Sequence, residues 1–599
     1  GQIEGQPTGF PLAGHVVEVE GDLGGFELFV EVERAAPGVE IARLRLVAPS
    51  PAQPPSFSLR WSLPSHDVRG YWSSAAGLDK TISPDWYPSR VRSTLARHAP
   101  LLTLFGGDDQ NRLTFAVSDA HNAVTLSAGV REEDARVHGR IDFFEERHRA
   151  VETVEVEVRF DIREVRFEEA IRAVTTWWAE HPGYEPVPAP DVGRLPMYST
   201  WYSYHQSVSA EALLTEVEAA RTLGYEAIIV DDGWQTLDSQ RGYAFTGDWR
   251  PERIPDMKGF VDAVHDRGMK FLLWYAVPLV GERSEAFVRL RGKFLRYWDG
   301  QGAYELDPRF PEVRAHIIDT YRTAIRAWGV DGFKLDFLGR FVADEATVLE
   351  ASEGRDFASV SEATDRLMRD IMAELREVKP DVLIEFRQPY IGPLMRTYGN
   401  LFRAGDAPNS LTDNRVRVVD LRLSSGNTTV HSDMLMWHVG ESVEGAALQL
   451  LNVLFAVPQL SVRLAEIPSA HLEMVRHYTD YWRSNRHVLL DGVFQARRPL
   501  ANYPLVWAHD EDKLIAVTYA EVTVPVGELG ALSRMDVVNA TSGGRVVLDV
   551  RAPLGEYRFR VLDAVGRTSA TGAVSLSEGA VAFDVPSAGL LELVRSSSE

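Results

Sequence analysis

The spacing of apolar residues divides the chain into several parts. In the first part, apolar and polar positions alternate over short stretches separated by proline and glycine, which is typical of half-buried strands. Such stretches occur at residues 26–32, 41–47, 113–117 and 151–160. Many short strands with frequent turns predict a large N-terminal β-sandwich, and we expect it to span residues 1–180.

A proline-rich segment follows the predicted sandwich. Prolines stand at positions 182, 186, 188, 190 and 196. Proline lacks a backbone N–H and resists both helix and central strand. We therefore expect residues 181–196 to form a linker between domains.

From residue 197 to 490 the pattern changes to strands that alternate with helices. A predicted helix at 211–223 has one apolar stripe and is followed by Gly224, a frequent helix terminator. Strands are expected at residues 196–201, 227–231, 270–276, 332–336, 382–386, 401–404, 429–432 and 460–463. Eight strands with intervening helices predict a central (β/α)₈ TIM barrel. The alternative is an open doubly wound sheet, but no glycine-rich dinucleotide fingerprint follows the first strands.

After about residue 488 the helical pattern stops. Apolar stretches at 514–517, 546–550, 557–561 and 580–583 predict short strands. We expect residues 491–599 to form a small antiparallel C-terminal β-sandwich. The predicted fold class is thus multidomain, with a central α/β barrel flanked by a large and a small β domain.

Composition narrows the possible partners and chemistry. The chain has 86 acidic and 63 basic residues, a formal charge of −23, which disfavours nucleic acid and anionic membranes as partners. No apolar run reaches the roughly 18 residues of a membrane span. The absence of cysteine excludes disulfides, thiolate zinc sites and a cysteine nucleophile. With no signal peptide recognisable in the given sequence, a cytoplasmic location is slightly favoured, and localisation is otherwise unknown.

The ends of the predicted barrel strands carry most of the candidate chemistry. In a TIM barrel, the active site lies at the carboxyl ends of the strands. Charged or aromatic residues occupy seven of these ends: Trp201 and Tyr202, Asp231 and Asp232, Trp274 and Tyr275, Lys334 and Asp336, Arg387, Arg403 and Asp406, and His431 and Asp433. This clustering predicts a polar site at that face of the barrel.

Lys334 and Asp336 are two positions apart in one predicted strand, so their side chains face the same way. A cation beside a carboxylate keeps it ionised, as a nucleophile requires. The alternative is that the two residues form an ion pair with a structural role only.

Asp406 supplies a second carboxylate at a later strand end. Retaining glycosidases use two carboxyl groups about 5–5.5 Å apart, one as nucleophile and one as acid/base. Asp413, Asp420 and Asp433 compete with Asp406 for the acid/base role, and Asp406 could instead be a surface-loop residue.

Asp231 and Asp232 are adjacent carboxylates at a strand end, and sugar hydroxyls are suitable donors for them. A helix cap or a metal site is the alternative. Trp201, Trp249 and Trp274, together with Trp234, could offer flat faces to the apolar side of a sugar.

Four stretches give the barrel a family resemblance, and they cover roughly residues 195–490. They are Asp231-Asp232-Gly233-Trp234, Gly247-Asp248-Trp249, Phe333-Lys334-Leu335-Asp336-Phe337 and Arg403-Ala404-Gly405-Asp406-Ala407-Pro408. In sequence, order and spacing these resemble glycoside hydrolase family 36, the α-galactosidases of clan D. The flanking β domains resemble that family in layout only.

The resemblance implies a role for each matching residue. Asp336 would attack the anomeric carbon, and Asp406 would protonate the leaving oxygen and then activate water. Asp231 and Asp232 would bind the 4- and 6-hydroxyls, and Lys334 would bind hydroxyls beside the nucleophile. Arg403 would contact the sugar or orient the acid/base, and Trp274 or a neighbouring aromatic residue would support the ring.

The sequence departs from the family at two places. The loop after the fifth strand usually carries a cysteine- and glycine-rich stretch near the sugar's 2-substituent, but here it contains Arg387. The segment around His431 and Asp433 also lacks a match in the best-known members. Both departures leave the glycone open, because an arginine could favour an altered 2-position or another sugar.

The sequence therefore predicts a retaining, exo-acting α-galactosidase that takes an oligosaccharide or glycoside substrate and needs neither metal nor organic cofactor. Transglycosylation and a different glycone are variants on the same site. A metal-dependent, sugar-isomerase-like barrel that uses Asp231, Asp232, His431 and Asp433 is an alternative of another class, and a non-catalytic carbohydrate-binding barrel is a third. A homo-oligomer is compatible with the sequence.

Overall fold

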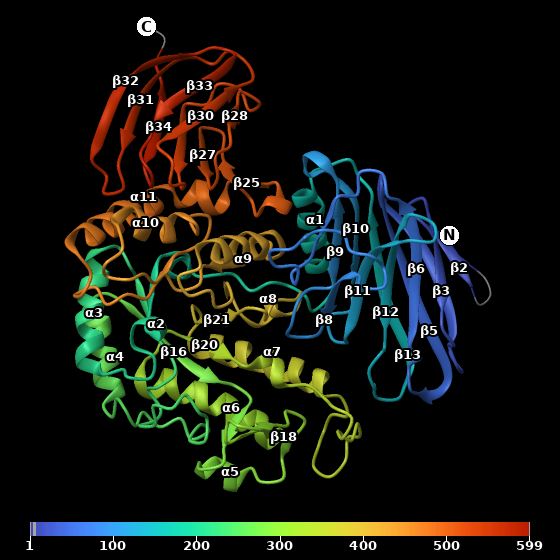
Figure 1. Ribbon diagram of the computed structural model, residues 1–599. Coiled ribbons are helices and arrows are strands. Elements are labelled where there is room, and N and C mark those ends of the chain that lie inside the picture. The colour runs from blue at the N-terminus through green and yellow to red at the C-terminus, as the bar shows by residue number, and fades with distance from the viewer. Residues whose placement is uncertain (1, 4–6, 598–599) are drawn as a thin grey trace.

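The computed structural model describes residues 2–3 and 7–597, in three successive parts (Figure 1). A β-sandwich, a parallel barrel and a second β-sandwich follow one another along the chain. The predicted multidomain fold with a central TIM barrel is confirmed. The exact limits at residues 180, 196 and 490 stay predictions.

The N-terminal sandwich consists of two antiparallel sheets. One contains, in spatial order, β1 (Gln2–Ile3), β4 (Glu27–Ala36), β5 (Val39–Ala52), β13 (Val151–Asp161), β10 (Asn111–Val117), β9 (Leu101–Phe105) and β7 (Gly70–Trp72). The other contains β2 (Gly9–Leu12), β3 (His15–Glu20), β6 (Phe57–Pro64), β12 (Arg136–Phe143), β11 (Val124–Arg131) and β8 (Ser89–Ser93). Trp61 of one sheet packs edge-on against Phe115 and Phe160 of the other, with ring centroids 4.8 and 4.7 Å away. Alternating apolar residues thus join the two sheets.

A helix that the strand pattern did not predict closes the N-terminal part. In α1 (Phe167–Ala179), buried residues Phe167, Ile171, Val174 and Trp178 recur at helical spacing. The helix packs on β9 and β10 of the sandwich and also on α9 (Leu411–Ser424) of the barrel. It therefore couples the sandwich to the barrel.

The barrel contains the eight parallel strands expected. In order they are β14 (Met197–Ser199), β15 (Ala227–Val230), β16 (Lys270–Ala276), β20 (Gly332–Asp336), β21 (Leu383–Arg387), β22 (Leu401–Arg403), β23 (Thr429–His431) and β24 (Gln459–Leu460). Bridges from His431 to Val457 and from Leu435 to Leu460 bring the last strand beside β23 and nearly close the barrel. The eighth strand is shorter than expected and begins one residue earlier.

Helices surround the barrel. Besides α9, they are α2 (Trp201–Tyr204), α3 (Ala210–Thr222), α4 (Met257–Asp266), α5 (Glu285–Arg289), α6 (Pro311–Thr323), α7 (Val360–Val378), α8 (Met395–Tyr398), α10 (Val443–Leu451) and α11 (Ser469–Asp491). In α7, the Ser359 hydroxyl accepts a hydrogen bond from the Glu362 N–H at the amino end, and a buried stripe includes Leu367 and Ile371. Within residues 2–3 and 7–597, no helix combines the length and the apolarity that crossing a membrane requires.

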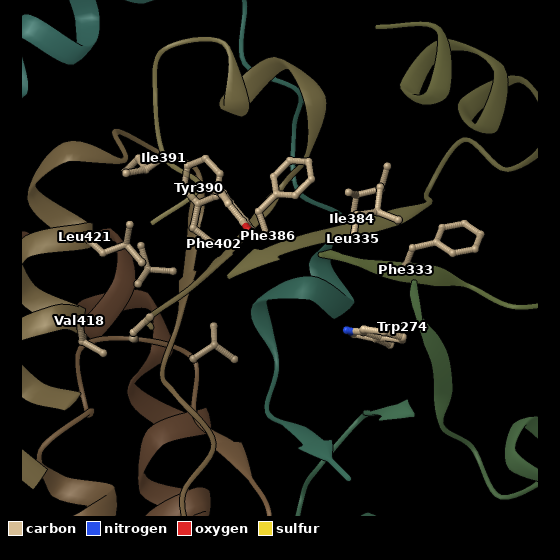
Figure 2. Close-up of a cluster of buried hydrophobic side chains, with 14 of the residues drawn as sticks. Trp274, Phe333, Leu335, Ile384, Phe386, Tyr390, Ile391, Phe402, Val418 and Leu421 are labelled. Atoms are coloured by element: carbon tan, nitrogen blue, oxygen red, sulfur yellow. The ribbon is translucent and has the colours of Figure 1, made fainter. Parts of the chain in front are cut away.

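The barrel strands place alternate side chains inside and outside. Phe333, Leu335, Ile384 and Phe386 belong to the buried apolar cluster of Figure 2, whereas the intervening side chains of the same strands are charged. Toward the amino ends of the strands, a separate apolar layer contains Met197, Ala227, Ile229, Leu272, Leu383 and Leu401. The charged groups therefore lie above an apolar floor, toward the carboxyl ends.

A small antiparallel sheet interrupts the barrel after β16. It consists of β17 (Leu279–Gly281), β19 (Ala303–Leu306) and β18 (Phe294–Trp298). Because it follows the carboxyl end of β16, it lies on the side of the barrel where a functional site is expected.

The C-terminal part is a second β-sandwich, as expected. Its larger sheet contains β25 (Val493–Arg497), β26 (Leu505–His509), β27 (Lys513–Thr518), β29 (Arg534–Asn539), β34 (Leu590–Arg595), β31 (Gly555–Leu562) and β32 (Thr568–Leu576). Its smaller sheet contains β28 (Val524–Val526), β30 (Arg545–Val550) and β33 (Gly579–Asp584). Two pairings, β27 with β29 and β28 with β30, are parallel, so the domain is mixed rather than wholly antiparallel.

One buried carboxylate joins the three parts. Asp420 of α9 accepts hydrogen bonds from the Trp72 indole of the N-terminal sandwich (3.0 Å) and the Tyr503 hydroxyl of the C-terminal part (2.6 Å). Lys80 of the N-terminal part forms an ion pair with the same carboxylate at 3.0 Å, and its side chain is fully buried. Asp420 is thus an organising contact between domains.

We expect Asp420→Ala to destabilise the protein by about 3–5 kcal/mol, because it leaves the buried Lys80 ammonium without its carboxylate. Thermal unfolding should show a lower midpoint than wild type. The exposed Asp480 of α11 provides a matched control, since Asp480→Ala removes the same group from a solvated position. Equal midpoints for the two variants would contradict the importance of the junction.

Candidate active site

Asp336 lies at the carboxyl end of β20 and is 6% exposed. Its Oδ1 accepts hydrogen bonds from Arg387 Nε (2.6 Å) and from the Phe337 N–H (2.8 Å). Its Oδ2 accepts a hydrogen bond from Trp274 Nε1 (3.0 Å). Three donors from three positions therefore fix both oxygens of this carboxylate.

The surrounding charges keep Asp336 ionised. Burial is the largest influence and raises the pKa of Asp336, but the charges of Arg387 and Lys334 and the bonds from Trp274 and Phe337 outweigh it. The pKa of Asp336 is therefore below its ordinary value. A buried, ionised carboxylate has the protonation state of a nucleophile.

Lys334 lies on the same face of β20 but pairs with a different carboxylate. Its Nζ donates to Asp231 Oδ2 at 2.5 Å, and both side chains are buried. Lys334 therefore acts on Asp336 through its charge alone, and Arg387 is the direct partner. Lys334 thus helps to keep Asp336 ionised, as expected, although its ion-pair partner is Asp231.

Asp232 is buried beside Asp231 in the loop after β15. Its carboxylate accepts hydrogen bonds from Gln235 Nε2 (2.7 Å) and Gln206 Nε2 (3.2 Å). Burial, followed by the charges of Asp231 and Asp336, raises the pKa of Asp232 to about 6, against the effect of the two amides. Asp232 therefore changes charge near neutral pH.

Asp406 follows β22 and has a side chain that is 53% exposed. Arg403 Nη2 donates to its Oδ1 at 2.9 Å, and Arg417 of α9 donates to its backbone carbonyl. Burial is the largest influence and raises the pKa of Asp406, but Arg403, Lys334 and Arg387 together lower it to about 2. Asp406 is thus an ionised carboxylate that solvent reaches.

Arg403 holds the second carboxylate in a network of buried groups. Besides Asp406, its guanidinium donates to Asp433 Oδ1, and the arginine is only 1% exposed. Asp433 Oδ2 accepts from the Tyr202 hydroxyl (2.9 Å) and from the Ala407 N–H (2.7 Å). Asp433 therefore orients Arg403 and the Asp406 loop, and does not compete for the acid/base position.

Asp336 and Asp406 lie in one electrostatic environment. Arg387 has its pKa raised by the charges of both carboxylates, and Lys334 lowers the pKa of both. Both carboxylates therefore lie within the electrostatic reach of Arg387 and Lys334. The site thus combines two ionised carboxylates with two cations whose charges act on both.

Aromatic rings form one wall of the site. Tyr243 stacks between Trp274 and Trp298, with centroid distances of 6.4 and 5.9 Å, and Arg340 lies over Trp298 at 3.5 Å from its centroid. Phe337 contacts Tyr243 edge-on at 5.3 Å, and its backbone has φ 65°. This left-handed conformation is rare for a bulky residue, and it directs the Phe337 N–H to Asp336.

The other two predicted tryptophans have different surroundings. Trp249 is 8% exposed and packs against Trp234, Trp274 and Tyr275, so it supports Trp274 from behind. Trp201, in α2, is partly exposed and lies beneath the Arg241 guanidinium, 5.5 Å away. Trp201 can therefore meet a ligand, whereas Trp249 is a packing residue.

Two predicted strand-end residues do not face the site. His431 is fully buried, its Nε2 contacts the Gly193 carbonyl at 2.7 Å, and Gln459 Nε2 contacts its Nδ1 at 3.1 Å. Since Gly193 precedes β14, His431 reaches toward the amino ends of the strands, and burial lowers its pKa to about 4. The prediction of His431 as a ligand-binding residue is therefore not supported by its position. Tyr275 points outward because its neighbour Trp274 points inward.

Several residues at the site were not predicted from the sequence. Glu385 faces inward two positions before Arg387, is fully buried, and accepts a hydrogen bond from Gln459 Nε2 (2.6 Å). Burial raises its pKa. Glu385 is two positions before Arg387 in the same strand, and this spacing could have predicted that it faces the site. Tyr243 lies in a long loop, where no sequence pattern predicts its position.

No group of three or more His, Asp or Glu side chains could hold a metal ion among residues 2–3 and 7–597. Asp231 already forms an ion pair with Lys334, Asp433 forms one with Arg403, and the His431 ring faces away from both. The four residues considered for a metal-dependent alternative therefore do not form one ligand set.

In sequence, part of the barrel is similar to known α-galactosidases. The Melibiase family model matches residues 194–386. A blood group A α-D-galactosamine galactosaminidase from Flavonifractor plautii is 31% identical over 145 residues, which is 21% of this chain and 12% of that protein. α-Galactosidase Mel36A from Lactobacillus acidophilus is 25% identical over 201 residues, or 32% of this chain and 26% of that protein. The matches thus span about a quarter or less of these curated relatives.

Solved structures share the whole architecture. α-Galactosidase AgaB from Geobacillus stearothermophilus superposes with a TM-score of 0.63 at 13% identity, covering 100% of this chain and 86% of that one. AgaA from the same organism, in a variant bound to raffinose, gives a TM-score of 0.61 at 13% identity and covers 97% of this chain and 83% of that one. Residues 194–386 therefore match the Melibiase family, and the three-part fold is similar to that of α-galactosidases AgaA and AgaB.

Proposed function

We propose that the chain is a retaining, exo-acting α-galactosidase that removes terminal non-reducing α-galactosyl residues by double displacement. The observation that supports this most directly is the ionised, triply hydrogen-bonded Asp336 together with the solvent-accessible Asp406, since the charges of Arg387 and Lys334 act on both. The melibiase match and the α-galactosidase relatives support the choice of sugar. Raffinose, bound by AgaA, suggests an oligosaccharide substrate.

In the first step, an Asp336 oxygen attacks the anomeric carbon while the bond to the leaving oxygen breaks and Asp406 donates a proton to that oxygen. In the second step, Asp406 takes a proton from water, which attacks the anomeric carbon and releases Asp336. A sugar acceptor in place of water would give transglycosylation.

The low pKa of Asp406 requires a change when substrate binds. In the free site Arg403, Lys334 and Arg387 outweigh the effect of burial, so the carboxylate has lost its proton. A bound glycoside would exclude water from the exposed half of the side chain, which raises the pKa of a carboxyl group. We therefore propose that substrate binding itself prepares Asp406 as the acid.

Asp231, Asp232 and Lys334 are suited to bind sugar hydroxyls beside the nucleophile. Both carboxylates are buried, and Asp232 is held by two amides that leave acceptor capacity on its oxygens. Arg403 positions Asp406 through their hydrogen bond. Trp274 serves both to bond Asp336 and to border the sugar.

The glycone is tested by a panel of aryl α-glycosides. We expect the aryl α-galactoside to turn over with α-galactose as the first product seen by NMR, because two displacements retain configuration.

Asp336→Ala should reduce this turnover by about 10⁴-fold or more while the protein stays folded, since the covalent step is lost. Asp413→Ala is the matched control, as Asp413 lies in the first turn of α9 and accepts a hydrogen bond from Ser410 (3.2 Å). Near-wild-type activity of Asp336→Ala would remove the proposed nucleophile.

Asp406→Ala should slow raffinose hydrolysis by about 10²–10⁴-fold, whereas an aryl galactoside with a good leaving group should lose much less in its first step. The reason is that a stable leaving anion needs little protonation. The comparison is made by burst kinetics on the aryl substrate and steady-state rates on raffinose. If both first steps slow equally, Asp406 is not the acid.

Asp232 should give kcat/KM an acidic limb near pH 6. Below about pH 6 this carboxyl group is protonated and loses acceptor capacity for sugar hydroxyls, so kcat/KM should fall; above it, binding is complete. Asp336, with its lowered pKa, cannot produce this limb. In Asp232→Asn the limb should disappear at a lower overall kcat/KM. Persistence of the limb in that variant would assign it to another group.

A further inference from the structure

A cationic cavity lies on the opposite end of the barrel from the candidate active site. Its volume is about 580 Å³, and it lies between α1 of the N-terminal part and the ends of α9 and α11. Thr429, the first residue of β23, lines it, so the cavity is at the amino ends of the barrel strands. Figure 1 shows α1 at the sandwich edge that faces α9.

Arginine dominates the lining of this cavity. The charged lining residues are Arg172, Arg194, Arg396, Arg422 and Asp491. Asp491 accepts hydrogen bonds from Arg194 Nη2 at 2.6 and 2.7 Å, so its charge is already balanced. The lining therefore carries three positive charges in excess.

Arg396 is the most buried of these cations, with 5% exposure. Its Nε donates to Thr428 Oγ1 (3.0 Å) and its Nη2 to Asn427 Oδ1 (2.8 Å). Within the described part of the chain, no carboxylate pairs with it, and burial alone lowers its pKa to about 10. Arg396 is thus a buried cation whose hydrogen bonds are made by neutral groups.

Arg422 repeats this arrangement on the neighbouring wall. It donates to the carbonyls of Phe455 (2.8 Å), Leu490 (2.9 Å) and Leu489. Burial is the main cause that lowers its pKa to about 9; the charge of Asp491 opposes this effect, and the nearby Arg172 and Arg194 add to it. Burying like charges together is unfavourable unless an anion accompanies them.

We propose that this cavity binds a small molecule that carries a phosphate group. Guanidinium groups match phosphate oxygens with paired N–H donors, and the excess charge suits a dianion better than a single carboxylate. Thr176, Ser425 and Asn427 line the same space and can supply neutral hydrogen bonds. The volume exceeds that of one phosphate, leaving room for an organic moiety.

The overall charge of the protein makes this local excess more informative. A chain of net charge −23 disfavours non-specific anion binding, so anion binding requires a local excess of positive charge such as this one. Since the cavity contacts both α1 and α9, a bound phosphate would join the N-terminal sandwich to the barrel. The proposal is independent of the glycosidase activity, because it concerns the other end of the barrel.

The test is calorimetric titration of the intact protein with pyrophosphate, together with thermal unfolding. We expect one binding site per chain and a rise in the unfolding midpoint as pyrophosphate is added. Arg172→Gln should weaken binding by about tenfold or more, since one charge-assisted contact is lost. Arg172 is exposed and makes only a 3.4 Å contact to the Phe494 carbonyl, so this change should leave the fold intact.

Thr176→Glu is the second variant, because it places a carboxylate at the rim without removing a cation. It should weaken binding by a similar factor. Arg558→Gln is the matched control, as it removes an exposed arginine from β31, far along the chain in the C-terminal sandwich. Its affinity for pyrophosphate should equal that of wild type.

Further titrations with inorganic phosphate, glucose 6-phosphate and glucose distinguish the ligand sources. Tighter binding of glucose 6-phosphate than of inorganic phosphate would assign the site to an organic phosphate, and equal binding would assign it to the phosphate group alone. Glucose should not bind at this site. The proposal is overturned if none of the phosphate compounds binds, or if Arg172→Gln, Thr176→Glu and Arg558→Gln all bind pyrophosphate like wild type.

Discussion

The nearly closed barrel directs alternate side chains of each strand into one narrow interior, and the rest of the site depends on which residues fill that interior. Near the amino ends it is apolar, as with Leu272, Leu383 and Leu401. Two positions further along β21 and β22, the inward residues are Glu385 and Arg403. Charges in such a confined space persist only when they are paired, so each cation is shared among carboxylates from other strands.

This pairing sets the chemical state of each carboxylate. Asp336 is bonded to Arg387 and is ionised, whereas Glu385, which is more deeply buried, has a raised pKa. Asp232, whose side-chain partners are two amides, has its pKa raised to about 6, mainly by burial. Residues of one chemical type thus have different protonation because their strand and depth give them different partners. In the arginine-rich cavity at the other end, by contrast, four arginines share a single carboxylate, so positive charge remains in excess.

Much of this arrangement follows from sequence periodicity, but the partners do not. The period-two spacing of Lys334 and Asp336 predicted that both face the same way, and both point into the barrel. Which carboxylate Lys334 would bind depends on the stagger between β15 and β20, which no local pattern encodes, and it proved to be Asp231. For His431, spacing could not tell which end of the barrel the ring would reach. The α1 helix follows directly on a strand-rich region, and the helical spacing of its apolar residues is the signal that distinguishes it from the strands.

Helix α9 carries two of the contacts described above within one turn. Arg417 donates to the backbone carbonyl of Asp406, and Asp420 receives groups from both outer domains. A displacement of either β-sandwich would therefore be transmitted through α9 to the loop that holds the proposed proton donor. The outer domains then help to hold the active site in place. Removing one of them would make the Asp406 loop more mobile without changing any residue that contacts substrate.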